Sequence, residues 1–203
     1  MGEPARALPT FEELYREIAA LPEGMTGEIL GPGWLRTMSR PGQPHGRASR
    51  RLLRSLRGSD LLEDGTGWWF EVEAEILLGD RLVVPDISGW RAEQELDFGG
   101  ENPITVRPDW VCEILSRGTQ RGDRAVKLPV YAAEGVGHVW IVDPEAATIE
   151  VYASQDGKAV LVDTAIGNVR RTLAPFPDEI DVGGLWKPAR KPDAETPDTG
   201  SQP

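Results

Sequence analysis

One apolar run near the middle of the chain limits the folds open to it. Residues 109–115 read Asp-Trp-Val-Cys-Glu-Ile-Leu, and after the first position only Glu113 interrupts the apolar side chains. A continuous run of this kind is typical of a central strand that is buried on both faces. A helical stretch follows at residues 122–135, and a second apolar strand follows at 138–142. Together with the hairpins before it, this strand–helix–strand unit predicts an α/β fold with a mixed β-sheet flanked by helices.

The remaining segments are assigned from hydrophobic periodicity and turn residues. Thr10 is the expected N-cap of a first helix that ends by Pro22. A second helix is expected from residue 43 or 45 to residue 57, and residues 87–108 are expected to be loop-rich, with one helical turn at 91–95. The expected strands cover residues 28–30, 34–38, 68–78, 81–85, 148–153, 158–164, 169–172 and 179–182.

The size and composition indicate one globular domain. The chain has 203 residues, and 39% of them are hydrophobic, which is enough for one core. We assign this domain to residues 10–186, a flexible N-terminus to 1–9 and a disordered, Pro-rich tail to 187–203. Cys112 is the single cysteine, which excludes an internal disulfide. The first residues lack the apolar region of a signal peptide and no run is long enough to span a membrane, so we expect a cytoplasmic protein.

Positive charge is concentrated in one segment of an otherwise acidic chain. The net charge of −11 argues against nucleic-acid binding, yet residues 36–57 contain seven arginines and no aspartate or glutamate. One face of the helix expected here is apolar, and the opposite face could meet DNA phosphates. The alternative is a solvated basic face that pairs with acidic residues of this chain or of a second subunit. The predicted DNA-binding residues are Arg47, Arg50, Arg51, Arg54 and Arg57.

Two carboxylates lie in or directly after apolar strands. Asp86 ends the run Val-Val-Pro-Asp, and Glu113 interrupts the run described above. Burying even a neutral polar group without a partner costs roughly 2–7 kcal/mol, so both carboxylates need compensation. Mg²⁺ prefers oxygen ligands and keeps several waters, and one cation could bind both groups if the two strands are neighbours. The alternatives are a Pro-Asp turn for Asp86 and a buried pair with arginine or lysine for Glu113.

Lys127 is a third candidate for a hydrolytic site. It lies one helical turn after Asp123, so the two side chains share a face of the expected helix. A lysine beside a metal could orient a water molecule or stabilise negative charge on a phosphate. The alternative is a solvated ion pair of Asp123 with Lys127, which would contribute little. Pro129 removes a backbone donor, so the helix must start late or kink there.

Four motifs follow one another in a recognisable order. They are Val-Val-Pro-Asp at 83–86, Val-Cys-Glu-Ile-Leu-Ser at 111–116, Arg-Gly-Asp-Arg-Ala-Val-Lys-Leu-Pro-Val-Tyr at 121–131 and His-Val-Trp-Ile-Val-Asp-Pro at 138–144. This order resembles the Uma-two family of restriction-type endonucleases, in the PD-(D/E)xK nuclease superfamily. The resemblance covers residues 26–186 and is most specific over 109–152.

The resemblance implies a restriction-endonuclease-like core with a divalent metal, Mg²⁺ or Mn²⁺, at one sheet edge. By motif position, Asp86 and Glu113 would be catalytic and would bind the metal, with the Ile114 carbonyl as a third ligand. Lys127 would be the catalytic lysine. Supporting roles fall to Glu28, His45 and Asp123.

One position departs from the superfamily pattern. The motif places a lysine two residues after the second acid, where this chain has Leu115, so Lys127 would take over the role from the following helix. The leading hypothesis is a DNA endonuclease that hydrolyses phosphodiester bonds, acting as a homodimer whose two sites address two strands. The second is a catalytically silent nuclease-fold protein that binds nucleic acid or a protein. The third is a structural module whose carboxylates form internal ion pairs.

Overall fold

The computed structural model describes residues 7–39, 43–62, 64–94, 102–116, 118 and 120–186, without the side chains of 43, 44 and 94. The tail predicted at 187–203 and most of the N-terminus predicted to be flexible, residues 1–6, lie outside these ranges. No helix in the described ranges combines the length and the apolar character needed to cross a membrane.

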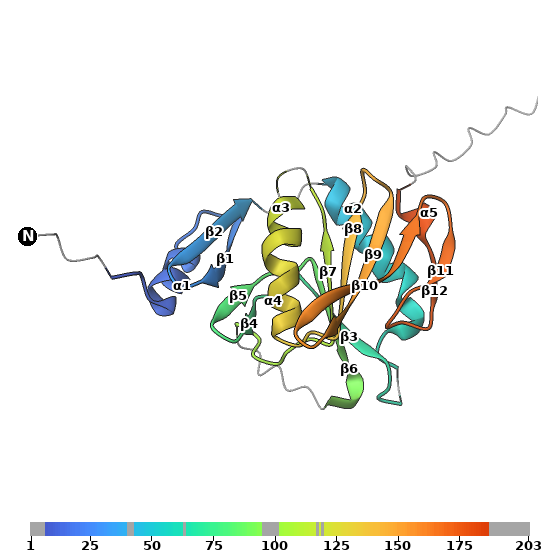
Figure 1. Cartoon of the computed structure of the whole chain (residues 1–203), viewed down its shortest axis with the longest axis horizontal. Helices are drawn as coiled ribbons and strands as arrows, with labels where there is room; N and C mark the ends of the chain where they lie inside the picture. Colours follow the sequence, from blue (N-terminus) through green and yellow to red (C-terminus); the bar gives the residue numbers. More distant parts are fainter. Residues whose placement is uncertain are drawn as a thin grey trace, which may run out of the picture.

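Helices and strands follow one another in the order drawn in Figure 1. The helices are α1 (Phe11–Ala19), α2 (Gln43–Ser55), α3 (Gln120–Gly122), α4 (Leu128–Ala133) and α5 (Val182–Trp186). The strands are β1 (Met25–Gly31), β2 (Trp34–Ser39), β3 (Trp68–Val72), β4 (Ile76–Leu78), β5 (Arg81–Val83), β6 (Ile87–Arg91), β7 (Trp110–Ile114), β8 (His138–Asp143), β9 (Thr148–Gln155), β10 (Lys158–Ile166), β11 (Arg170–Thr172) and β12 (Glu179–Asp181). Short 3₁₀ helices, η1 (Arg57–Ser59) and η2 (Ala92–Gln94), and a π-helical turn, η3 (Asp123–Lys127), complete the order.

The largest sheet has six strands in the order β10-β9-β8-β7-β6-β3. β7 and β8 are parallel, with Glu113 opposite Ile141, and the other pairs in this sheet are antiparallel. The segment α3–η3–α4 joins the two parallel strands and crosses over the sheet (Figure 1). The predicted α/β fold with a mixed sheet is therefore confirmed.

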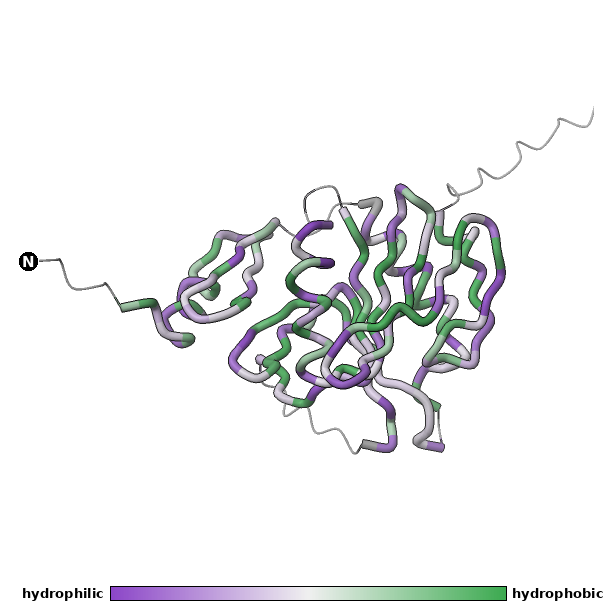
Figure 2. Tube along the Cα trace, viewed as in Figure 1, coloured by the Kyte–Doolittle hydropathy of each residue, from purple (hydrophilic) through white to green (hydrophobic). Residues whose placement is uncertain are grey.

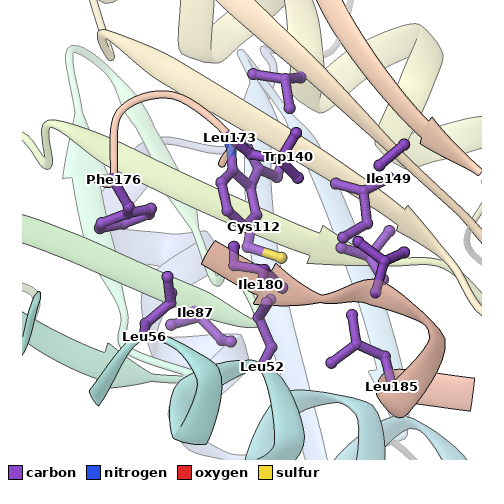
Figure 3. Close-up of a cluster of buried hydrophobic side chains, with 14 of the residues drawn as sticks. Leu52, Leu56, Ile87, Cys112, Trp140, Ile149, Leu173, Phe176, Ile180 and Leu185 are labelled. Carbon is purple, nitrogen blue, oxygen red and sulfur yellow. The ribbon is translucent and has the colours of Figure 1, made fainter. Parts of the chain in front are cut away.

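Different helices cover the two faces of this sheet. Alternate residues of a strand point to opposite faces, so Cys112 and Glu113 of β7 diverge. Cys112 packs in the cluster that includes Leu52 of α2, drawn in Figure 3. Val111, on the opposite face, packs in the cluster that includes Leu128 of α4. Helices thus flank the sheet on both sides, and Glu113 points toward the α4 side.

A smaller sheet, in the order β2-β1-β5-β4, carries the first helix. Leu14 of α1 packs against Ile29 of β1 and Leu82 of β5. Thr10 caps α1 as predicted, because its side chain accepts the Glu13 N–H at 3.3 Å while the Glu13 carboxylate accepts the Thr10 N–H at 2.8 Å. The blue part of this unit in Figure 1, made of α1, β1 and β2, brings β2 beside the α3–η3 segment.

The single strand predicted at residues 68–78 is wrong. β3 and β4 belong to different sheets, and the backbone between them turns at Glu73, whose φ is +52°. The alternation of apolar and acidic residues runs through this break. Periodicity alone therefore could not reveal where the chain changes sheets.

Strand β6 lies in a stretch predicted to be loop. Gly89 weakens its apolar pattern, and the packing around it is tight, because a Cβ would lie 3.1 Å from the Trp110 ring and 3.2 Å from Phe70. β6 pairs with β7 at Ile87 opposite Cys112. This pairing places Asp86, the residue just before β6, beside β7.

Candidate active site

A cavity of about 360 Å³ opens where the end of β7 meets β2, the start of α2 and the α3–η3 segment. Figure 2 shows a hydrophilic α3 trace beside the hydrophobic trace of β7 in this region. Glu28, also a predicted site residue, is fully buried and contacts the cavity residue Lys127. The predicted site residues that line the cavity are His45, Asp86, Glu113, Ile114, Asp123 and Lys127.

Asp86 reaches the end of β7 from the loop between β5 and β6. Its Oδ2 accepts the Ile114 backbone N–H at 2.5 Å and lies 2.9 Å from Nε2 of His45. An aspartate in an ordinary Pro-Asp turn bonds its own neighbouring backbone instead. The carboxylate of Asp86 is therefore tied to the next strand of the sheet, close to Glu113.

Glu113 is a buried carboxylate with its own hydrogen-bond partners. Its Oε1 lies 2.7 Å from Nζ of Lys127 and accepts a hydrogen bond from the Tyr131 hydroxyl at 2.5 Å. Burial raises the pKa of Glu113 well above its ordinary value; Lys127 lowers it by less, and the negative charges of Asp86 and Asp123 raise it further. Glu113 is therefore a group that a nearby positive charge would stabilise in its ionised form.

Lys127 is the last residue of a π-helical turn, and its side chain is buried. The Leu128 N–H bonds to the Asp123 carbonyl, five residues back, and Pro129 then lies in the first turn of α4, directly after the π-helical turn. Asp123 and Lys127 are both buried on this turn. A π-helical turn of this kind is frequent at functional sites, and here it resolves the awkward proline.

The Lys127 ammonium group has three N–H donors, and three protein acceptors surround it. They are Oε1 of Glu28 at 2.7 Å, Oε1 of Glu113 at 2.7 Å and the Val84 carbonyl at 3.2 Å. These acceptors outweigh the effect of burial, so the pKa of Lys127 is raised and the group is a cation at neutral pH. The Lys127 side chain therefore forms buried ion pairs, in place of the solvated ion pair with Asp123 that was considered from the sequence.

His45 connects two groups predicted to bind metal. It lies in the first turn of α2, pairs with Asp86 and hydrogen-bonds to the Ile114 backbone. Burial lowers the pKa of His45, but the hydrogen bond to Asp86 and the charges of Asp86 and Glu73 more than offset this, so the pKa is raised overall. His45 thus orients Asp86 and adds positive charge at slightly acidic pH.

Two residues of the site, Arg36 and Tyr131, were not assigned from the sequence. Arg36 of β2 places Nη1 3.4 Å from Oδ1 of Asp123 and 3.6 Å from Oε2 of Glu28. Tyr131 lies one helical turn after Lys127, and this spacing is a signal that could have indicated a shared face. Arg36 had no such local signal, because the contact with Asp123 joins residues far apart in the chain.

Leu115 occupies the position where the superfamily pattern expects lysine. It lies on the same face of the sheet as Glu113, and it is buried in the cluster that includes Leu128 and Tyr131. A lysine here would enter that apolar cluster. Lys127 instead brings an ammonium group to Glu113 from the helix above.

Two of the five arginines predicted to bind DNA, Arg51 and Arg57, differ in setting from the other three. Arg51 donates to the Gly184 and Leu185 carbonyls at 3.0 and 3.3 Å, and therefore holds α5 against α2. The helix ends at Ser55, so Arg57 lies beyond it in η1. The prediction that all five arginines lie on a DNA-facing side of one helix is therefore wrong for these two, because the helix is shorter than expected and α5 packs against it. The exposed arginines of α2 are Arg47, Arg50 and Arg54, and Arg57 is exposed in η1.

The chain has three tyrosines, and the hydrogen bonds of their hydroxyl groups can be tested by titration. The hydroxyls of Tyr15, Tyr131 and Tyr152 donate to Glu75, Glu113 and Glu150. Burial and the neighbouring carboxylates raise all three pKa values, that of Tyr15 to about 12.

We expect tyrosine ionisation in the native protein, followed by ultraviolet absorbance, to begin clearly above the pH of about 10 typical of an unfolded chain in urea. Because only the unfolded chain releases these protons near pH 10, the free energy of unfolding should fall as the pH rises above that point. A single native transition centred at pH 10 would contradict the three contacts.

The sequence match to a known family spans the site and most of the fold. The sequence model of the Uma2 family, described as "Putative restriction endonuclease", matches residues 10–182. The chain belongs to the Uma2 family. The resemblance to the Uma-two family noted from the motifs is thereby confirmed.

A solved structure has the same overall fold as this Uma2 chain. It is described as a putative nuclease belonging to DUF820 from Anabaena variabilis ATCC 29413. The two are 21% identical, with a TM-score of 0.67, and the match covers 88% of this chain and 97% of the other. A comparison with curated proteins finds no match. The Uma2 family and the fold together support a nuclease role.

The donor atoms of the Uma2 site fit a hard divalent cation. Asp86, Glu113 and Ile114 line one cavity, and carboxylate and carbonyl oxygens are the ligands that Mg²⁺ prefers. The described residues contain no cluster of three His, Cys, Asp or Glu side chains suited to a metal, so a site here would rely on the carbonyl and on water. Among the described residues, acidic side chains around the cavity outnumber permanent cations. The acidic residues are Glu28, Asp86, Glu113 and Asp123, and the cations are Arg36 and Lys127.

Proposed function

We propose that this Uma2 protein is a divalent-metal-dependent endonuclease that hydrolyses phosphodiester bonds in DNA. The observation that carries the proposal is the convergence of Asp86, Glu113 and Lys127, from three separate segments, on one cavity. Carboxylates that served only internal ion pairs would have no need of an open cavity beside them. A carboxylic acid with a raised pKa, as at Glu113, beside a cation in a cleft is a usual feature of an active site.

The residues of the site have complementary roles in this proposal. Asp86, Glu113 and the Ile114 carbonyl would hold Mg²⁺ or Mn²⁺. Such a cation supplies positive charge to the phosphate and makes water more acidic. The Ile114 N–H and His45 fix the Asp86 carboxylate, and Lys127 fixes that of Glu113. Both carboxylates are therefore held in place before substrate arrives, which avoids reorganisation during the reaction.

The start of α2 offers a surface for DNA beside the cavity. His45 lines the cavity, and the exposed Arg47, Arg50 and Arg54 follow it along the helix. A Cβ at Gly46 would lie 3.5 Å from Nη1 of Arg50, so this guanidinium group lies close to the helix start. We propose that these arginines contact phosphates, and that a homodimer presents two sites to the two strands.

A second function is favoured by two specific observations. The three N–H donors of Lys127 all face protein acceptors, and Leu115 leaves no lysine on β7. A protein with this arrangement could bind nucleic acid or a protein partner without cleaving it. The two functions differ in a single measurable property, which is turnover.

Cleavage assays on plasmid and on single-stranded DNA test the proposed function. We expect the wild-type protein to cut in Mg²⁺ or Mn²⁺ and not in EDTA. Glu113→Gln keeps the shape of the side chain but removes its charge, and should reduce cleavage on the order of 100-fold or more. Replacing a residue that only supports a metal ligand already costs about 10–100-fold, and loss of a ligand should cost at least as much. The matched control is Glu93→Gln, which changes an exposed glutamate in η2 and should cut like wild type.

Each outcome of these assays has a distinct meaning. Cleavage that survives Glu113→Gln would place the activity in another centre or in a contaminant. DNA binding without cleavage by the wild-type protein in either metal would favour the silent binding module. Cleavage that persists in EDTA would contradict metal dependence.

A further inference from the structure

The cations around the cavity differ in how fully the protein engages them. The donors of Lys127 are taken up by Glu28, Glu113 and the Val84 carbonyl, as described above. Arg36 also lines the cavity, but only its Nη1 lies near protein acceptors. Among the described residues, its Nε and Nη2 form no hydrogen bond or ion pair, and neither atom is shut away from solvent. Arg36 is therefore the cavity cation whose N–H donors are not all used by protein acceptors of the described residues.

The contacts that Arg36 makes are long for an internal ion pair. Its Nη1 lies 3.4 Å from Asp123 and 3.6 Å from Glu28, whereas charge-assisted hydrogen bonds are typically about 2.7–2.9 Å. Oε2 of Glu28 is buried and forms no hydrogen bond within the described residues. A purely structural arginine would be expected to satisfy that oxygen. The two carboxylates instead hold the guanidinium group loosely from one side.

The chain leaves space for this guanidinium group at Gly122. A Cβ at that position would lie 2.6 Å from Nη1 of Arg36, 3.0 Å from its Cζ and 3.2 Å from its Nη2. Any residue other than glycine would therefore displace the group. The guanidinium group of Arg36 therefore lies against Gly122 of α3, at the wall of the cavity.

We infer that Arg36 contacts the substrate, binding a phosphodiester group of DNA through its Nε–H and Nη2–H donors. This inference rests on the proposed function and adds a residue that holds the substrate rather than the metal. The planar guanidinium group can present two parallel N–H donors to two phosphate oxygens, which an ammonium group cannot. Asp123 and Glu28 orient the group, and Gly122 gives it room.

Binding of a fluorescein-labelled DNA duplex, measured by anisotropy in Ca²⁺ and again in EDTA over a salt series, tests this assignment without requiring turnover. Arg36→Gln should weaken binding roughly tenfold or more, because a hydrogen bond to a charged group is lost. It should also reduce the slope of log affinity against log salt by about 0.9, the value for one phosphate contact. Arg170→Gln, an exposed arginine on β11, is the matched control and should change neither quantity.

A second variant changes the position of the guanidinium group without replacing Arg36, Asp123 or Glu28. Gly122→Ala should displace the guanidinium group and weaken DNA binding several-fold, with no loss of thermal stability. Gly31→Ala is its control, because a Cβ there meets no atom within 4 Å. Weaker binding by both Arg36→Gln and Gly122→Ala, with the smaller salt slope for the first, would establish the contact.

Failure of this inference and failure of the proposed function would give different results. Unchanged affinity in Arg36→Gln, or lower affinity with an unchanged salt slope, would overturn the inference even if the wild-type protein cleaves DNA. A wild-type protein that binds DNA through Arg36 but never cleaves it would leave the inference standing and overturn the proposed function. A wild-type protein that binds no DNA would overturn both.

Discussion

Replacing Asp86 with asparagine is expected to abolish DNA cleavage and to weaken metal binding while leaving the fold intact. The amide oxygen of asparagine can still accept the Ile114 N–H that Oδ2 of Asp86 accepts at 2.5 Å, so the tie to β7 survives. The negative charge is lost, however, and an amide oxygen is a poorer ligand for a hard cation. We expect the affinity for Mn²⁺, measured by calorimetry, to fall on the order of 100-fold or more, because even outer partners of a ligand account for 10–100-fold.

The two histidines of the chain give this variant an independent readout. The pKa of His45 is raised by Asp86 despite burial, whereas burial and Arg91 lower that of His138. In Asp86→Asn the pKa of His45 should fall, because its hydrogen-bonded anion has become neutral. The pKa of His138 should not move. Nuclear magnetic resonance titration resolves the two rings and reports whether the site geometry was as described.

The control and the contrary outcomes are specific. Asp80→Asn changes an aspartate whose side chain is 66% exposed in the turn before β5, and should bind metal and cleave like wild type. Full metal affinity in Asp86→Asn would remove Asp86 from the proposed metal site. A lowered pKa of His45 with unchanged cleavage would show that the pair exists but has no part in the reaction.

The position of Glu113 could be predicted because its local pattern is strong. A lone carboxylate in a continuous apolar strand must point to one face and must find a partner there. Asp86 was harder, since its place beside β7 depends on strand β6. That strand was missed, because Gly89 interrupts its pattern for a packing reason that involves Trp110 and Phe70.

The parts of the site that could not be predicted depend on contacts between distant segments. Nothing near Arg36 in the sequence indicates Asp123, which is 87 residues away. Likewise, the sequence placed Lys127 on a helix but could not show that Glu28, from β1, takes up one of its donors. The basic face of α2 was overestimated for the same reason, because the carbonyls that Arg51 binds lie near the end of the described chain.

Lys127→Met is expected to cost a large part of the stability of this molecule. It would leave the carboxylates of Glu28 and Glu113 buried without the cation that lies 2.7 Å from each of them. Breaking a buried pair by removing one partner typically costs about 3–5 kcal/mol. For a domain of this size that corresponds to a fall in melting temperature of about 6–20 °C. Lys158→Met, an exposed lysine at the start of β10, is the matched control and should melt like wild type.

The loss should depend on pH in a defined direction. Lys127 lowers the pKa of Glu113, so without it the carboxyl of the folded variant holds its proton to still higher pH. The folded variant then binds more protons than the unfolded chain above the ordinary pKa of glutamate, and its stability rises as the pH falls toward that value. Melting curves of the variant between neutral and mildly acidic pH should therefore move toward those of the wild-type protein.

Neutralising the two carboxylates as well separates the structural role of Lys127 from its role in cleavage. In Lys127→Met combined with Glu28→Gln and Glu113→Gln no buried charge is left unpaired at this point, and most of the lost stability should return, because neutral replacement of a whole buried ion cluster is often harmless. Cleavage should not return with it. A triple variant that is no more stable than Lys127→Met would contradict the ion-pair account. Cleavage by Lys127→Met at the wild-type rate, measured below its melting temperature, would show that the ammonium group only holds the fold together.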